Sequence, residues 1–136
     1  MVGFVGDDVG LLDYEKVFQK DLFSRAAEWR RERIMTGLCD ESLITESEVE
    51  YIKGGILGIV RYLYENGKAR LIDLDYGVGK MVGSFMESFG SPDITMLTDF
   101  MKERGIVSEG SYPYRFRLSS KYERVLDLLF MRSVAL

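Results

Sequence analysis

Apolar residues recur along the first part of the chain every three or four positions, which is the spacing of one face of an α-helix. Between about Asp13 and Met35 they are Tyr14, Val17 or Phe18, Leu22, Ala26 and Trp29. Arginines near the end of this stretch and Gly37 just after it are typical of a helix C-terminus. The pattern predicts one helix over residues 13–35.

A second helix is predicted from Thr45 to Asn66. Thr45 and Glu48 have the spacing of a capping box, in which the first side chain accepts a hydrogen bond from a backbone N–H of the first turn. Apolar residues then follow one face of the helix: Val49, Ile52, Ile56, Ile59 or Val60, and Leu63. Gly67 supplies the left-handed residue that commonly ends a helix.

Shorter elements follow. Residues 69–74 are interpreted as a short strand, and residues 76–89 as a helix with apolar residues on one face. Ser91-Pro92 has the residue types of an N-cap and a first helical position, and it predicts a further helix that runs to about Arg104 and ends at a glycine.

The last part of the chain predicts a β-hairpin and a helix. The hairpin covers residues 106–118, because Phe116 and Leu118 alternate with Arg115 and Arg117 in the manner of a half-buried strand. Ser119 or Ser120 then caps a final helix with apolar residues at Tyr122, Val125, Leu126, Leu129 and Phe130. The expected fold class is mainly α with a small β-hairpin, that is, α+β.

The composition removes much enzyme chemistry. The chain has no histidine, which excludes Ser-His-Asp and Cys-His catalysis, His-ligated zinc and proximal-His haem. Cys39 is the only cysteine, so an intramolecular disulfide is excluded and a reducing compartment is favoured. The longest uncharged run, Gly54–Val60, is far shorter than the roughly 20 residues that span a membrane. We expect a cytoplasmic binding protein without catalytic residues, metal or cofactor, and no membrane partner.

Two short motifs are interpreted as structural. Gly77-Val-Gly-Lys80 resembles part of a phosphate-binding loop, but Leu74 stands where that loop needs its first glycine, and Met81 where it needs Ser or Thr. Asp73 and Asp75 could hold Mg²⁺, but no third ligand accompanies them, so they are assigned to a polar loop edge. Side-chain amides are scarce beside abundant charge, which is typical of proteins from heat-loving organisms.

From Thr45 to about Arg132 the order of elements resembles the winged helix-turn-helix family. The most telling stretch is LTDFMKERGIV, from Leu97 to Val107, followed by YPYRFRLS, from Tyr112 to Ser119. It is similar to the passage in which the family's recognition helix ends at a glycine and leads through a strand and a wing into Tyr-x-Leu-Thr/Ser. The resemblance implies a winged-helix domain over residues 45–136, with residues 1–44 as an N-terminal arm and helical extension.

In that family the second helix of the pair usually enters the major groove, and the wing contacts the backbone or the minor groove. The resemblance therefore implies a transcriptional regulator that binds double-stranded DNA through the helix 93–104 and the wing 109–117. The implied DNA-binding residues are Thr95, Thr98, Lys102, Tyr112, Arg115, Arg117 and Lys121. The N-terminal helix is the expected dimerisation element of a homodimer, because the core of a winged domain does not need it.

The charge distribution leaves an alternative open. The net charge is −4, with ten basic and fifteen acidic residues in 1–75 and eight basic and seven acidic residues in 76–136. The helix 93–104 is itself poor in cations, which favours a winged-helix module that binds another protein instead of DNA.

Several basic and aromatic residues also have structural interpretations. Arg115 and Arg117 fit a solvated hairpin face equally well, since cations discourage pairing with another sheet edge. Arg30, Arg31 and Arg33 are interpreted as solvated charges at a helix end, and Trp29 is interpreted as a packing anchor.

Overall fold

The computed structural model describes residues 11–34, 45–82, 91–110 and 115–130 of the 136-residue chain. These residues form a mainly helical fold with a small antiparallel sheet, which confirms the predicted α+β class. Within them, no helix is both long enough and apolar enough to cross a membrane. The elements in chain order are α2 (Leu11–Tyr14), the 3-10 turn η1 (Glu15–Val17), α3 (Asp21–Ile34), α4 (Glu46–Asn66), β1 (Ala69–Arg70), α5 (Leu71–Val82), α6 (Ser91–Glu103), β2 (Val107–Glu109), β3 (Arg115–Leu118) and α7 (Ser120–Leu129).

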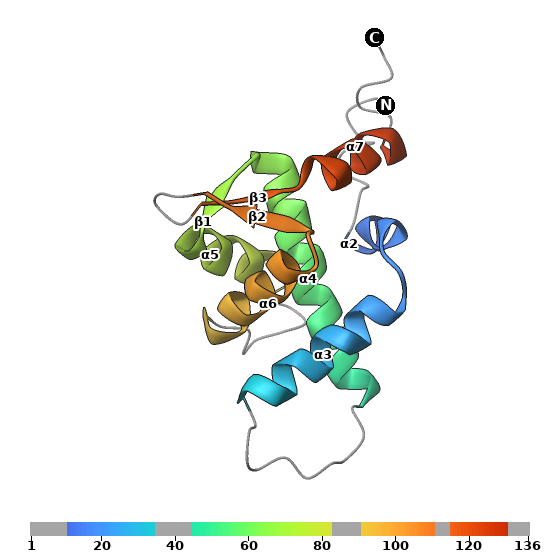
Figure 1. Ribbon diagram of the computed structural model, residues 1–136, viewed down its shortest axis with the longest axis vertical. Helices are drawn as coiled ribbons and strands as arrows, with labels where there is room; N and C mark the ends of the chain where they lie inside the picture. The colour runs from blue at the N-terminus through green and yellow to red at the C-terminus, as the bar shows by residue number, and fades with distance from the viewer. Residues whose placement is uncertain (1–10, 35–44, 83–90, 111–114, 131–136) are drawn as a thin grey trace.

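Helix α4 lies at the centre of the core (Figure 1). The Thr45 hydroxyl accepts a hydrogen bond of 3.2 Å from the Glu48 N–H, and Gly67 ends the helix at a φ of 86°, so both predicted ends are confirmed. Because residues 55–60 are all buried, neighbours must cover this helix on every side. Helices α3, α5 and α6 and strand β3 pack against it.

The prediction of one continuous helix over residues 13–35 is wrong. The chain is helical in α2 and η1, extended at Phe18 with φ −119° and ψ 152°, and helical again in α3. The Phe18 ring stacks on the ring of Tyr122 in α7, with the centroids 5.3 Å apart. The local pattern cannot reveal this contact, because its two partners lie far apart in the sequence.

The N-terminal segment is part of the main core. Its buried residues are Tyr14, Leu22, Phe23, Ala26 and Ala27, and they join the residues of α4 and α6 in one cluster. The expectation that the core does not need the N-terminal helix is therefore wrong. Whether this helix also forms a dimer stays a prediction.

Two predictions about the end of α3 have different outcomes. The Trp29 ring meets Phe100 edge-on, with the centroids 5.6 Å apart, which confirms its role as a packing anchor. Arg31 is more than a solvated helix-end charge, since its guanidinium donates to the Glu48 carboxylate at 2.8–3.0 Å across the α3–α4 contact. The side chain of Arg33 lies outside the described part of the structure.

The predicted strand over residues 69–74 is wrong beyond Arg70. Within this segment only Ala69 and Arg70, which form β1, pair with β3, and α5 begins directly after them, earlier than the predicted start at Tyr76. The reason is a local cap: the Asp73 carboxylate accepts a 3.0 Å hydrogen bond from the Arg70 N–H, which satisfies a donor at the start of the helix. The end of the predicted helix, residues 83–89, lies outside the described residues.

Gly77 has a packing role in α5. A Cβ at this position would overlap the ring of Tyr62 in α4, so the glycine allows the two helices to approach closely. This position inside a helix agrees with the rejection of a phosphate-binding loop at Gly77–Lys80.

The sheet contains the predicted hairpin and one strand more. Its order is β1-β3-β2, antiparallel throughout, so β3 is the central strand. The inner face packs into the core through Ala69, Val107, Phe116 and Leu118. The other face is exposed.

Helix α7 begins after Ser119, which is one of the two residues predicted as its N-cap. Of the apolar residues expected on its inner face, only Leu126 is fully buried, while Val125 and Leu129 are exposed. The Tyr64 hydroxyl donates a 2.7 Å hydrogen bond to Asp127, which attaches α7 to α4.

Replacing Phe23 by alanine tests whether the N-terminal segment belongs to the core. The side chain is 2% exposed, so its removal should lower the free energy of unfolding by about 3–5 kcal/mol. Lys20→Ala, at an exposed position nearby, should change it by no more than about 0.5 kcal/mol. Chemical denaturation measures both values. A loss below about 1 kcal/mol for Phe23→Ala would show that the segment is not part of the core.

Candidate nucleic-acid interface

Helix α6 presents the expected face except at Thr98. Ile94, Leu97 and Met101 form its buried stripe, and Thr98 is only 1% exposed. The prediction of Thr98 as an exposed DNA contact is therefore wrong. Thr98 follows Ile94 by four residues and precedes Met101 by three, which places it on the same side of the helix. Its hydroxyl donates to the carbonyl oxygen of Thr95 at 2.9 Å, so it is satisfied inside the protein.

The exposed face of α6 carries little positive charge. It presents Thr95, Asp99, Lys102 and Glu103. The Lys102 ammonium lies 2.6 Å from the Glu109 carboxylate in β2 and 4.0 Å from that of Asp99. The hydrogen bond to Glu109 raises the pKa of Lys102 above its ordinary value. The one lysine of this face is thus neutralised locally, and two carboxylates remain beside it.

The outer face of the sheet is the basic surface. Arg115 and Arg117 alternate with buried residues along β3, and Arg70 of β1 lies directly opposite Arg115. Directly paired residues in an antiparallel sheet point to the same side, so the three guanidinium groups belong to one face. We call Arg70, Arg115 and Arg117 the arginine face. Ser108 of β2, opposite Arg117, completes it.

The pairing of β3 bears on the two interpretations of its arginines. Cations that discourage edge pairing belong on an unpaired strand edge, and β3 pairs with β1 at Arg115 and Phe116 and with β2 from Phe116 to Leu118. Edge protection therefore does not account for Arg115, whereas Arg117 has a paired strand on one side only. Neither guanidinium forms an ion pair with another residue that the structure describes, so both are available to a ligand.

Asp73 screens one side of the arginine face. Its carboxylate accepts hydrogen bonds from the Arg70 guanidinium at 3.2 Å. These bonds hold the pKa of Asp73 below its ordinary value, and the charge of Arg115 lowers it further. Because this pKa is lower in the folded than in the unfolded state, the carboxylate stabilises the fold at neutral pH. That stabilisation is lost as the pH falls through the folded-state pKa.

The remaining predicted site residues do not join this surface in the described structure. Lys121 lines a pocket beside α7, where its ammonium lies 5.6 Å from the centre of the Tyr122 ring. Tyr112, together with the rest of residues 111–114, lies outside the described residues.

Sequence reasoning missed Arg70 as a member of the site. The signal was present in the pair Ala69-Arg70, which has the same buried–exposed alternation as Arg115-Phe116. A strand of two residues is too short for a periodicity, so its place became visible only through its pairing with β3.

Neither a metal site nor a comparison with known proteins indicates what this surface binds. No group of three or more His, Cys, Asp or Glu among the described residues could hold a metal ion, and Asp73 is hydrogen-bonded to Arg70. No match to this chain was found among protein-family models, curated proteins or solved structures.

The pKa of the Asp73 carboxyl tests the geometry of the arginine face. In the unmodified protein it should lie below the ordinary value of about 3.9. Arg70→Gln removes its main cause and should raise the pKa. Arg115→Gln should raise it less, since Arg115 acts through charge alone. An NMR titration of the side-chain carboxyls measures these values, with Arg124→Gln in α7 as the control. An identical pKa in all four proteins would contradict the described contacts.

Proposed function

We propose that this chain is a winged-helix protein that binds double-stranded DNA mainly through the arginine face. The order helix, strand, helix, helix and hairpin, from α4 to β3, supports the winged-helix assignment. The small sheet has its central strand in the hairpin, and Arg115 and Arg117 belong to the expected wing, residues 109–117.

The observation that carries the proposal is the pair Arg115 and Arg117 on the exposed side of a central strand. They leave the core face by alternation, and no described carboxylate is paired with either. A guanidinium presents a planar fork of donors that matches phosphate oxygens. Contacts of this kind position a protein on the DNA backbone without reading its sequence.

Helix α6 contributes less in this proposal than the family resemblance implies. Asp99 and Glu103 would face the phosphates with like charge, and Lys102 would have to leave Glu109 to reach one. Thr95 is the remaining exposed residue of the predicted contact set on this helix. Few phosphates are then neutralised by one copy, so binding should be weak at physiological salt.

A second copy would double the number of phosphate contacts. The homodimer through the N-terminal helix stays a prediction, and the inner face of α3 is already occupied in the core by Phe23, Ala26 and Ala27. A dimer contact by α3 would therefore use its outer residues.

A protein-binding module is the second candidate function. Ile72 and Tyr76 lie one turn apart on α5 and are 66% and 72% exposed. Large apolar side chains exposed side by side on one helix favour contact with another protein. In this case the acidic side of α6 would be part of a protein interface instead of a DNA interface.

Removing the two unpaired arginines tests the proposed function. Arg115→Ala combined with Arg117→Ala should weaken binding to random-sequence duplex DNA and reduce the slope of log K against log salt by about two. A double variant with Lys20→Ala and Arg124→Ala removes the same charge from exposed positions outside the arginine face, and its slope should equal that of the unmodified protein. A titration followed by gel shift at rising salt measures all three slopes.

Two outcomes would contradict the proposal. An unchanged slope in the Arg115/Arg117 variant would show that the arginine face does not contact phosphate. No shift of DNA by the unmodified protein at about 50 mM salt, where phosphate contacts are strong, would exclude DNA binding and leave the protein-binding module.

A further inference from the structure

A pocket of about 350 Å³ lies between the start of α3, the end of α6 and the first turns of α7. It exists because the N-terminal segment is not a continuous helix. The chain is extended at Phe18 and turns before α3 begins at Asp21, so this link forms one rim. The volume is at the lower end of the range of small-molecule sites, about 300–1,000 Å³.

Part of the pocket wall is apolar and comes from well-packed residues. Ile106 and Leu22 are buried residues of the core, and Phe18 and Tyr122 stack on each other at its side. Val125 of α7 adds a further apolar contact. Because these walls come from three separate parts of the chain, a ligand held here would contact all of them at once.

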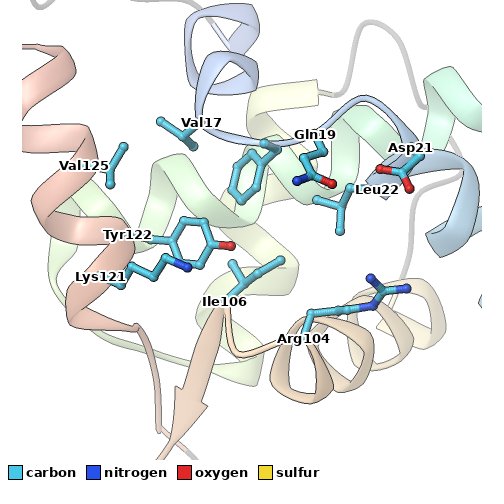
Figure 2. Close-up of a pocket in the computed structure, with 10 residues that line it drawn as sticks. Val17, Gln19, Asp21, Leu22, Arg104, Ile106, Lys121, Tyr122 and Val125 are labelled. Carbon is cyan, nitrogen blue, oxygen red and sulfur yellow. The ribbon is translucent and has the colours of Figure 1, made fainter.

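The polar groups of the pocket are mainly donors. Figure 2 shows Lys121 at one side and Arg104 at the other, with Tyr122 and Ile106 between them. In the described structure neither cation is matched with a carboxylate, since Arg104 lies over the Phe100 ring and Lys121 near the Tyr122 ring. The Gln19 amide and the Tyr122 hydroxyl add neutral hydrogen-bonding groups.

One carboxylate also lines the pocket, but its charge is engaged elsewhere. Asp21 accepts a 3.1 Å hydrogen bond from the Arg25 guanidinium, four residues later in α3. The lining therefore keeps an excess of positive charge from Arg104 and Lys121. An apolar wall with cations at two ends fits a ligand that has a hydrophobic body and an acidic group.

We propose that this pocket binds a small amphipathic carboxylate, such as an aromatic acid. The hydrophobic body lies against Ile106 and Tyr122, and the carboxylate accepts hydrogen bonds from Arg104 or Lys121. A bare phosphate would leave the apolar wall without a partner. This inference does not depend on DNA binding, and its test contains no DNA.

Calorimetric titration with 2-naphthoate tests the site. The unmodified protein should bind it, and 2-naphthamide, which has the same ring system without the charge, should bind at least about tenfold more weakly, the effect of one charge-assisted hydrogen bond. Arg104→Gln combined with Lys121→Gln should weaken naphthoate binding by about tenfold or more for the same reason. Arg124→Gln, an exposed cation of α7 outside the pocket lining, should leave it unchanged.

A second pair of variants tests the place of binding without altering charge. Val125→Trp should fill the pocket and abolish naphthoate binding. Leu128→Trp introduces the same side chain at an exposed position of α7 that does not line the pocket, and it should bind like the unmodified protein. The amide NMR spectrum of each variant checks that its fold is retained.

Three results would overturn the proposal. The first is no binding of naphthoate by the unmodified protein. The second is equal binding of the acid and the amide, which would indicate an apolar pocket without anion recognition. The third is unchanged binding by the folded Val125→Trp variant, which would place the ligand elsewhere.

Discussion

Helix α4 carries only apolar residues and glycines over positions 55–60, all of them buried, so no side of its middle part faces water. The rest of the structure follows from this constraint, because the exposure of such a helix would leave a large apolar area in water. Helix α3 crosses it near one end and the sheet lies beside the other, with α5 and α6 packed between (Figure 1). Since α4 and the other helices use the inner face of the sheet, only its outer face remains for a ligand.

The elements that the sequence predicts best are those with local causes. The cap at Thr45, the terminal Gly67 and the alternation from Arg115 to Leu118 each depend on residues close together in the chain. Thr98 was also within reach of the sequence, because its spacing from Ile94 and Met101 places it on the buried stripe. Its polar hydroxyl suggested exposure, but the Thr95 carbonyl satisfies that hydroxyl within the helix.

The elements that the sequence does not predict depend on distant contacts. The helix break at Phe18 accompanies stacking of its ring on that of Tyr122, which lies about a hundred residues later in the chain. Strand β1 is only two residues long and is defined by its pairing with β3. For the same reason the arginine face could be predicted only in part: Arg115 and Arg117 follow from alternation, whereas Arg70 requires the strand pairing. The pocket beside α7 could not be predicted, since it depends on the break at Phe18.

The charge of the molecule acquires a different meaning once it is placed on the fold. A net charge of −4 disfavours nucleic acid, and the acidic side of α6 agrees with that view. The arginine face does not, because its cations are concentrated on the one exposed side of a small sheet. Asp73 is the carboxylate that limits this surface, and it is held there by its role in capping α5.

The affinities of Asp73→Asn and Asp99→Asn for random-sequence duplex DNA test most directly the proposal that the arginine face contacts phosphate. Each substitution removes one exposed carboxylate, and an Asn at position 73 can still accept the hydrogen bond from the Arg70 N–H. Fluorescence anisotropy at about 50 mM salt measures both affinities. Our account predicts binding about three- to fivefold tighter for Asp73→Asn, the effect of one exposed charge, and little change for Asp99→Asn. Tighter binding by Asp99→Asn alone would place the DNA on α6 and contradict the account.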